Sequence, residues 1–88
     1  MIRKTIHFFG KVQGVGFRYT TRSTATGFNV SGYVRNLSNG SVELVVEGNG
    51  MEIQRFLDML RNRMCGHIDR EDERESPATG EFSGFDVR

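Results

Sequence analysis

A β-hairpin in the middle of the chain is the feature that most limits how this sequence can fold. Apolar and polar side chains alternate over residues 30–35 and again over residues 42–46, and Ser38-Asn39-Gly40 lies between the two runs. An Asn-Gly pair between alternating runs is a strong hairpin signal, because both residues tolerate a positive φ. The sequence therefore predicts an antiparallel pair of strands at the centre of the chain.

Periodicity predicts one strand and one helix before the hairpin and a second helix after it. Side chains alternate over about residues 4–12, which is typical of a strand. A polar stretch rich in threonine follows from Phe17 to about Thr26, and we expect a short helix closed by Gly27 as its C′ residue, the one after the C-cap. Apolar residues at helical spacing predict the second helix over about residues 51–64.

The last part of the chain predicts two more strands. Residues 69–75 are too charged for a buried strand, but an edge strand tolerates charges, and Pro77 would end it. Phe82, Phe85 and Val87 predict a short terminal strand. The order βαββαβ, with this extra strand, predicts an α+β, ferredoxin-like sandwich: an antiparallel sheet with two helices on one face.

Length and charge describe one small domain with a basic first half. The 88 residues fit a single domain over residues 1–88. Residues 1–42 contain six Lys and Arg and no Asp or Glu, whereas all eleven carboxylates follow from Glu43 onward. The net charge of +1 argues against a general polyanion binder, so we expect a local anion site in the first half. Chance segregation of charge is the alternative.

Cysteine content and hydropathy predict a cytoplasmic protein. The single cysteine, Cys65, excludes an internal disulfide and fits a reducing compartment, although it could pair between chains under oxidising conditions. No apolar run is long enough to span a membrane or to act as a signal peptide. The mixed charges of the expected edge strand favour a monomer.

The segment Gly10-Lys11-Val12-Gln13-Gly14-Val15-Gly16-Phe17-Arg18 has the layout of an anion-binding loop. Glycines let successive backbone N–H groups point into one concavity, and the following helix adds a partial positive charge of about half a unit at its N-terminus. Arg18 supplies a planar guanidinium that can bind a phosphate through two hydrogen bonds. We therefore expect phosphate or sulfate to bind here.

The residues missing from the basic half restrict the chemistry of such a site. Its only histidine is His7, which period-two counting places on the strand face opposite Phe8. No carboxylate or cysteine is available as a metal ligand, and no base is visible to activate a serine or threonine hydroxyl. Positioning and electrostatics remain, and they suit an acyl phosphate, because its carboxylate leaving group departs without an acid.

Two segments of the chain resemble the signatures of the acylphosphatases. Residues 10–18 closely resemble the first signature, and Gly32-Tyr33-Val34-Arg35-Asn36-Leu37-Ser38-Asn39-Gly40-Ser41-Val42, followed by Gly48, resembles the second. The resemblance implies the ferredoxin-like α/β sandwich. It also implies hydrolysis of a small-molecule acyl phosphate to a carboxylate and inorganic phosphate, with no cofactor or metal.

The resemblance also assigns roles to individual residues. Arg18 is similar to the arginine that binds the phosphate, and Asn36 to the asparagine that holds the attacking water. An amide can both donate and accept hydrogen bonds, so Asn36 can orient a water in line with the scissile bond. The backbone N–H groups that would assist Arg18 belong to Gln13, Gly14, Val15, Gly16 and Phe17; the side chain of Val15 is expected to pack.

Two other functions stay open at this point. One is an RNA-binding module, because the RRM shares the βαββαβ order, although its aromatic segment lies on the third strand rather than after the first. The other is a domain of the same family that only binds its ligand. Taken singly, Arg18 could be a surface residue in a salt bridge and Asn36 a turn former.

Overall fold

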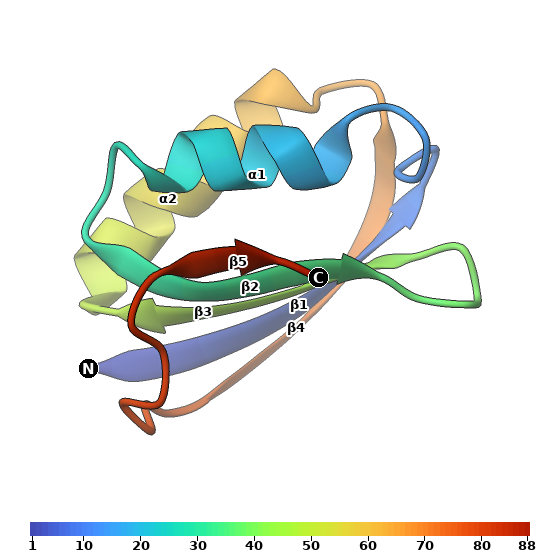
Figure 1. The fold of residues 1–88 in the computed structure, drawn as a ribbon. Coiled ribbons are helices and arrows are strands. Elements are labelled where there is room, and N and C mark those ends of the chain that lie inside the picture. Colours follow the sequence, from blue (N-terminus) through green and yellow to red (C-terminus); the bar gives the residue numbers. More distant parts are fainter.

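The computed structural model describes all residues 1–88 and contains every predicted element (Figure 1). The sequence patterns thus located the helices and strands, and only the ends of these elements differ from the predictions. In chain order the elements are β1 (Ile2–Gly10), α1 (Phe17–Ala25), β2 (Val30–Asn36), β3 (Val42–Gly48), α2 (Gly50–Arg63), β4 (Ile68–Pro77) and β5 (Phe85–Val87).

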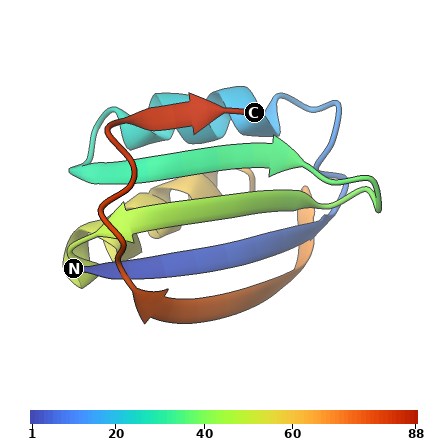
Figure 2. The ribbon, with the colours of Figure 1, turned by 60° about the horizontal axis from the view of Figure 1, so that its bottom comes forward.

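The strands form one five-stranded sheet in the order β4-β1-β3-β2-β5, and both helices cover the same face (Figures 1 and 2). The pairs β1–β3, β1–β4 and β2–β3 are antiparallel. The fold class is therefore the predicted ferredoxin-like sandwich. The expectation of a wholly antiparallel sheet is wrong at one edge, because β5 runs parallel to β2, with Gly32 opposite Phe85.

The core lies between the helices and the covered face of the sheet. Every second residue of β1 and β2 points into it, as with Ile6 and Phe8, and α2 contributes one apolar stripe. Burying such side chains is the main favourable term in folding, at about 25 cal/mol per Å² of apolar surface. The fully buried large side chains are Phe8, Phe17, Phe56, Ile6, Leu44, Ile53, Leu57, Leu60, Val12, Val34, Val42 and Val46.

The weakly helical sequence of α1 is stabilised by its packing. Thr21 and Thr24 are buried, and their hydroxyls donate to the carbonyl oxygens of Phe17 and Thr20, one turn back, at 2.8 and 2.7 Å. Gly27 is the C′ residue as predicted, directly after the C-cap Thr26; it has no positive φ, and its N–H donates to the carbonyl oxygen of Thr24 at 3.1 Å. A tighter turn therefore ends this helix. Neither helix is long and apolar enough to cross a membrane.

The charged run near the end of the chain forms an edge strand, as predicted, and the strand continues to Pro77. Its register with β1 places Glu71 and Glu73 opposite Phe8 and Ile6, on the side of the helices. There the guanidinium of Arg61 binds Glu71 at 2.8 Å, and Lys4 binds Glu73 at 3.0 Å. The sequence of β4 is thus explained by cations on α2 and β1 that meet its carboxylates.

A buried carboxylate on β3 holds the segment that leads to β5. Glu47 is 4% exposed, and it accepts hydrogen bonds from Arg3 at 2.7 Å and from the N–H groups of Thr79 and Gly80 at 3.0 Å. Burial by itself would raise the pKa of Glu47, but the hydrogen bonds from Thr79, Arg3 and Gly80 outweigh it and lower the pKa to about 2. Glu47 therefore fixes residues 79–80, and these residues lead directly into β5.

Replacing Glu47 should loosen this segment in a pH-dependent way. Because the pKa of Glu47 is lower in the folded than in the unfolded chain, its contribution is present above pH 4.5 and is lost as the pH falls towards 2. We expect Glu47→Gln to lower the free energy of unfolding at pH 7 by about 1–3 kcal/mol. The difference from wild type should shrink between pH 4.5 and 3.

Denaturant unfolding followed at pH 7, 4.5 and 3 measures both effects. Glu75→Gln, which changes an exposed carboxylate of β4, is the matched control and should leave stability within about 0.5 kcal/mol. A loss that is equal for the two variants, or that does not change with pH, would show that Glu47 does not hold the segment as an ion.

Candidate active site

The loop between β1 and α1 is held at both ends by apolar side chains. Val12 and Phe17 are buried, and the Phe17 ring packs against Phe8 with 5.0 Å between the ring centroids. The residues between these anchors are exposed. Because Phe17 begins α1 with its side chain in the core, the next residue, Arg18, is directed away from the core.

Two glycines shape the exposed part of the loop. Gly14 has φ 75° and Gly16 has φ 78°, whereas Val15 between them has no positive φ. This alternation is the pattern that turns successive N–H groups into an anion-binding concavity. A Cβ atom at either glycine would meet nothing within 4 Å, so backbone conformation, and not lack of space, is what requires glycine here.

Arg18 has no Asp or Glu partner. Its Nη1 donates to the main-chain oxygen of Arg88, the last residue of the sequence, at 3.2 Å, and none of the ion pairs of the structure involves it. The reading of Arg18 as salt-bridged to an acidic side chain is therefore wrong. Its charge is available to an anionic ligand.

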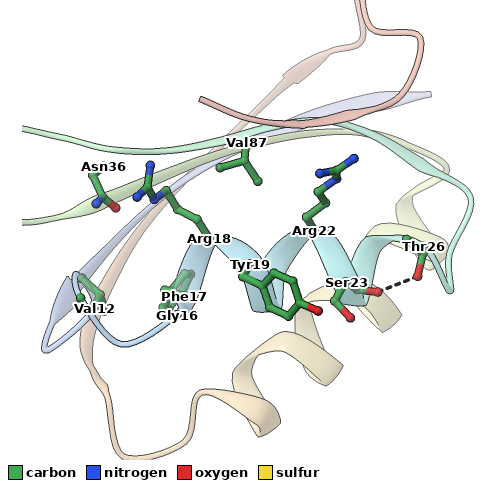
Figure 3. A pocket seen from close by; sticks show the side chains of 11 residues that line it. Val12, Gly16, Phe17, Arg18, Tyr19, Arg22, Ser23, Thr26, Asn36 and Val87 are labelled. Atoms are coloured by element: carbon green, nitrogen blue, oxygen red, sulfur yellow. Dashed lines mark hydrogen bonds between the residues drawn. The ribbon is translucent and has the colours of Figure 1, made fainter.

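Asn36 reaches the same place from a different element. It is the last residue of β2, half-buried, and its backbone pairs with Val42 across the hairpin. Figure 3 shows the guanidinium of Arg18 extending towards the amide of Asn36. The fold thus brings together two side chains that are 18 residues apart in the sequence, an arginine from α1 and an amide from β2.

A surface depression of about 690 Å³ contains both side chains. Of the predicted residues, Gly14, Gly16 and Phe17 also line it. None of its lining residues is Asp, Glu, His or Cys, and nowhere in the chain do three such residues cluster to hold a metal ion. The site therefore offers positive charge, an amide, hydroxyl groups and backbone groups.

Sequence reasoning missed six lining residues, which are Val12, Tyr19, Arg22, Ser23, Thr26 and Val87. Arg22 carried a usable signal, because it follows Arg18 by four residues, and residues at this spacing lie on one side of a helix. The sequence contains no comparable signal for Val87, because only the pairing of β5 with β2 brings Val87 to the site.

Two predicted loop residues lie outside the lining of the depression. The side-chain amide of Gln13 donates to the carbonyl oxygens of Leu37 and Ser41 at 2.8 and 2.9 Å. Gln13 thereby ties the loop to the β2–β3 turn. The expectation that Val15 packs is wrong, because its side chain is 39% exposed at the tip of the loop. Binding through the backbone N–H groups of both residues stays a prediction.

His7 lies on the open face of the sheet, away from the depression, as predicted. Its Nε2 is 2.9 Å from Oε2 of Glu43 on the neighbouring strand β3. Burial would raise the pKa of Glu43, but hydrogen bonds from His7, Arg35 and Tyr33 outweigh it and lower that pKa. This cluster is therefore a cross-strand network and not part of the candidate site.

The arrangement required of an RRM is not present. In that module aromatic side chains on the open sheet face stack against bases. Here Phe17 is buried beneath α1, and β3 contains no aromatic residue. No feature of the site therefore favours RNA.

Comparison with known sequences finds one family, the acylphosphatases. The family model described as Acylphosphatase matches residues 4–87. A protein of Paenarthrobacter aurescens named Acylphosphatase is 41% identical over 87 residues, which cover 98% of this chain and 93% of that protein. One of the same name from Syntrophus aciditrophicus is 44% identical, over 96% and 91% of the two chains.

Comparison with solved structures also finds acylphosphatases. The crystal structure of acylphosphatase from Bacillus subtilis superposes with a TM-score of 0.91 at 29% identity, covering 100% of this chain and 99% of that one. An acylphosphatase from Coxiella burnetii gives 0.83 at 32% identity, covering 98% and 90%. HypF of T. kodakarensis gives 0.84 at 36% identity, with all of this chain matching 12% of that protein.

Replacing either loop glycine by alanine should cost stability through backbone strain. An alanine in the left-handed region costs about 1–2 kcal/mol, so we expect Gly14→Ala and Gly16→Ala each to lower the free energy of unfolding by about that amount. Gly84→Ala is the matched control, because Gly84 has no positive φ and equally open surroundings. Denaturant unfolding measures the free energy of unfolding of each variant. The same loss of stability in all three variants would contradict the explanation by backbone strain.

Proposed function

This chain belongs to the acylphosphatase family, whose enzymes hydrolyse acyl phosphates, and we propose that its depression between α1 and β2 is where the reaction takes place. The supporting observation is that Arg18 and Asn36 line it together, with no carboxylate, imidazole or thiol beside them. An acyl phosphate needs none of these groups, because its leaving group is a stable carboxylate.

In this proposal the loop and Arg18 bind the phosphoryl group. The guanidinium donates two hydrogen bonds to phosphoryl oxygens, in place of the contact with the carbonyl of Arg88. The backbone N–H groups of residues 13–17 and the N-terminus of α1 supply the remaining positive potential. These donors stabilise charge on the equatorial oxygens in the transition state.

Asn36 holds the attacking water on the other side of the phosphorus atom. Its side-chain carbonyl accepts a hydrogen bond from the water and so orients the water oxygen towards phosphorus. The water oxygen forms a bond to phosphorus, and the bond from phosphorus to the acyl oxygen breaks. The carboxylate leaves with the electron pair, and the protons of the water pass to phosphate and solvent. Correct positioning of the water is the contribution of Asn36.

Inorganic phosphate or sulfate is expected to occupy the same site. We also propose that residues 1–88 act as one monomeric domain in the cytoplasm, on a small-molecule acyl phosphate and without a cofactor. The single hydrophobic core, the charged edge strand β4 and one exposed cysteine, Cys65, support this part of the proposal.

The two side chains should differ in which kinetic constant they affect. With benzoyl phosphate, Arg18→Ala should lower kcat/KM by about 10²–10³-fold, the loss of about 2.7–4 kcal/mol typical of a transition-state hydrogen-bond donor. It should also weaken inhibition by inorganic phosphate. Asn36→Ala should lower mainly kcat and leave phosphate inhibition nearly unchanged, because Asn36 acts on the water.

Two substitutions away from the depression serve as controls. Arg74→Gln removes an exposed arginine of β4, and Asn62→Ala removes an exposed amide of α2. Both should keep wild-type kinetics. Full activity of Asn36→Ala, or a phosphoenzyme isolated after mixing with substrate, would rule out direct attack by a water on this residue. Phosphate binding without hydrolysis by the wild type would instead show a domain that only binds.

Removal of metal ions should leave the reaction unchanged. The lining of the depression provides no carboxylate, imidazole or thiolate ligand. We expect the same kcat and KM for benzoyl phosphate before and after dialysis against EDTA. Loss of activity that Mg²⁺ or Zn²⁺ restores would contradict the electrostatic mechanism.

A further inference from the structure

Arg22 is a second arginine in the same depression, and the reaction described above does not use it. It lies in the last turn of α1, four residues after Arg18 and about 6 Å further along the helix axis. Like Arg18, it takes part in none of the ion pairs of the structure, although the chain contains eleven carboxylates.

An apolar surface separates the two guanidinium groups. Figure 3 shows the side chains of Arg18 and Arg22 on the same side of α1, with Val87 of β5 between them. Val87 is 40% exposed and lines the depression. The site therefore has a cation at each end and a hydrocarbon patch in the middle, an arrangement that matches a molecule with two anionic groups joined by carbon atoms.

We propose that Arg22 selects acyl phosphates whose acyl part bears a second carboxylate. This proposal rests on the proposed function, because the phosphoryl group must first be held by Arg18 and the loop. The acyl chain then lies over Val87, and its far carboxylate pairs with the planar guanidinium of Arg22. Arg22 is a specificity-determining residue in this scheme and has no part in the chemical step.

A purely structural role for Arg22 predicts a different result. A cation in the last turn interacts favourably with the helix dipole, and its removal would lower stability by a few tenths of a kcal/mol without any effect on substrate choice. A general attraction of anions would change KM for all acyl phosphates equally. Only a direct contact changes the preference between two substrates that differ in one carboxylate.

The test compares 4-carboxybenzoyl phosphate with 4-methylbenzoyl phosphate, which have similar size and differ in charge at the far end. The measured quantity is the ratio of their kcat/KM values. For Arg22→Gln we expect this ratio to fall about two- to fivefold relative to wild type, as for one exposed ion pair. Nearly all of the change should lie in KM, and it should diminish at high salt.

Two further variants make the result specific. Arg22→Lys keeps the charge and should keep most of the wild-type ratio, whereas Arg74→Gln, which removes a distant exposed arginine without an ion pair, should keep all of it. An unchanged ratio in Arg22→Gln would overturn the proposal. Hydrolysis of 4-methylbenzoyl phosphate by the wild type tests the proposed function separately, so failure of one is distinguishable from failure of the other.

Discussion

The packing of Phe17 against Phe8 is the contact on which the rest of the site depends. It fixes the first residue of α1 against strand β1, so the chain between Val12 and Phe17 must form a loop that projects from the sheet. It also determines the direction of the helix side chains that follow. Because the ring of Phe17 points into the core, Arg18 and Arg22 lie on the other side of α1 and face the depression.

Pairing among charged groups leaves positive charge near that loop. Of the six cations in the first half of the chain, Arg3, Lys4 and Arg35 bind carboxylates on β3 and β4. The remaining three, which are Lys11, Arg18 and Arg22, follow β1 and bind none. The charge asymmetry of the sequence is thus concentrated at one end of the fold, where an anionic substrate can use it.

Much of the fold could be predicted because its signals are local. The hairpin, both helices and the charged edge strand follow from periodicity and turn residues, each within a short stretch of chain. One error concerns a feature that depends on a distant partner: the parallel pairing of β5 depends on β2, about 50 residues earlier in the chain, since Gly32 lies opposite Phe85. The other is local, because Val15 lies exposed between two positive-φ glycines of the loop.

By itself the sequence determined the element order, the glycines of the loop between β1 and α1, and the two residues proposed for the reaction. These are properties of short segments, because backbone preference and hydrogen-bonding capacity belong to each residue. Only the tertiary structure decided which side chains share one depression. Placing Asn36 and Val87 beside Arg18 requires the register of β2 with its neighbours, and that register is fixed by burial of one face of the whole sheet.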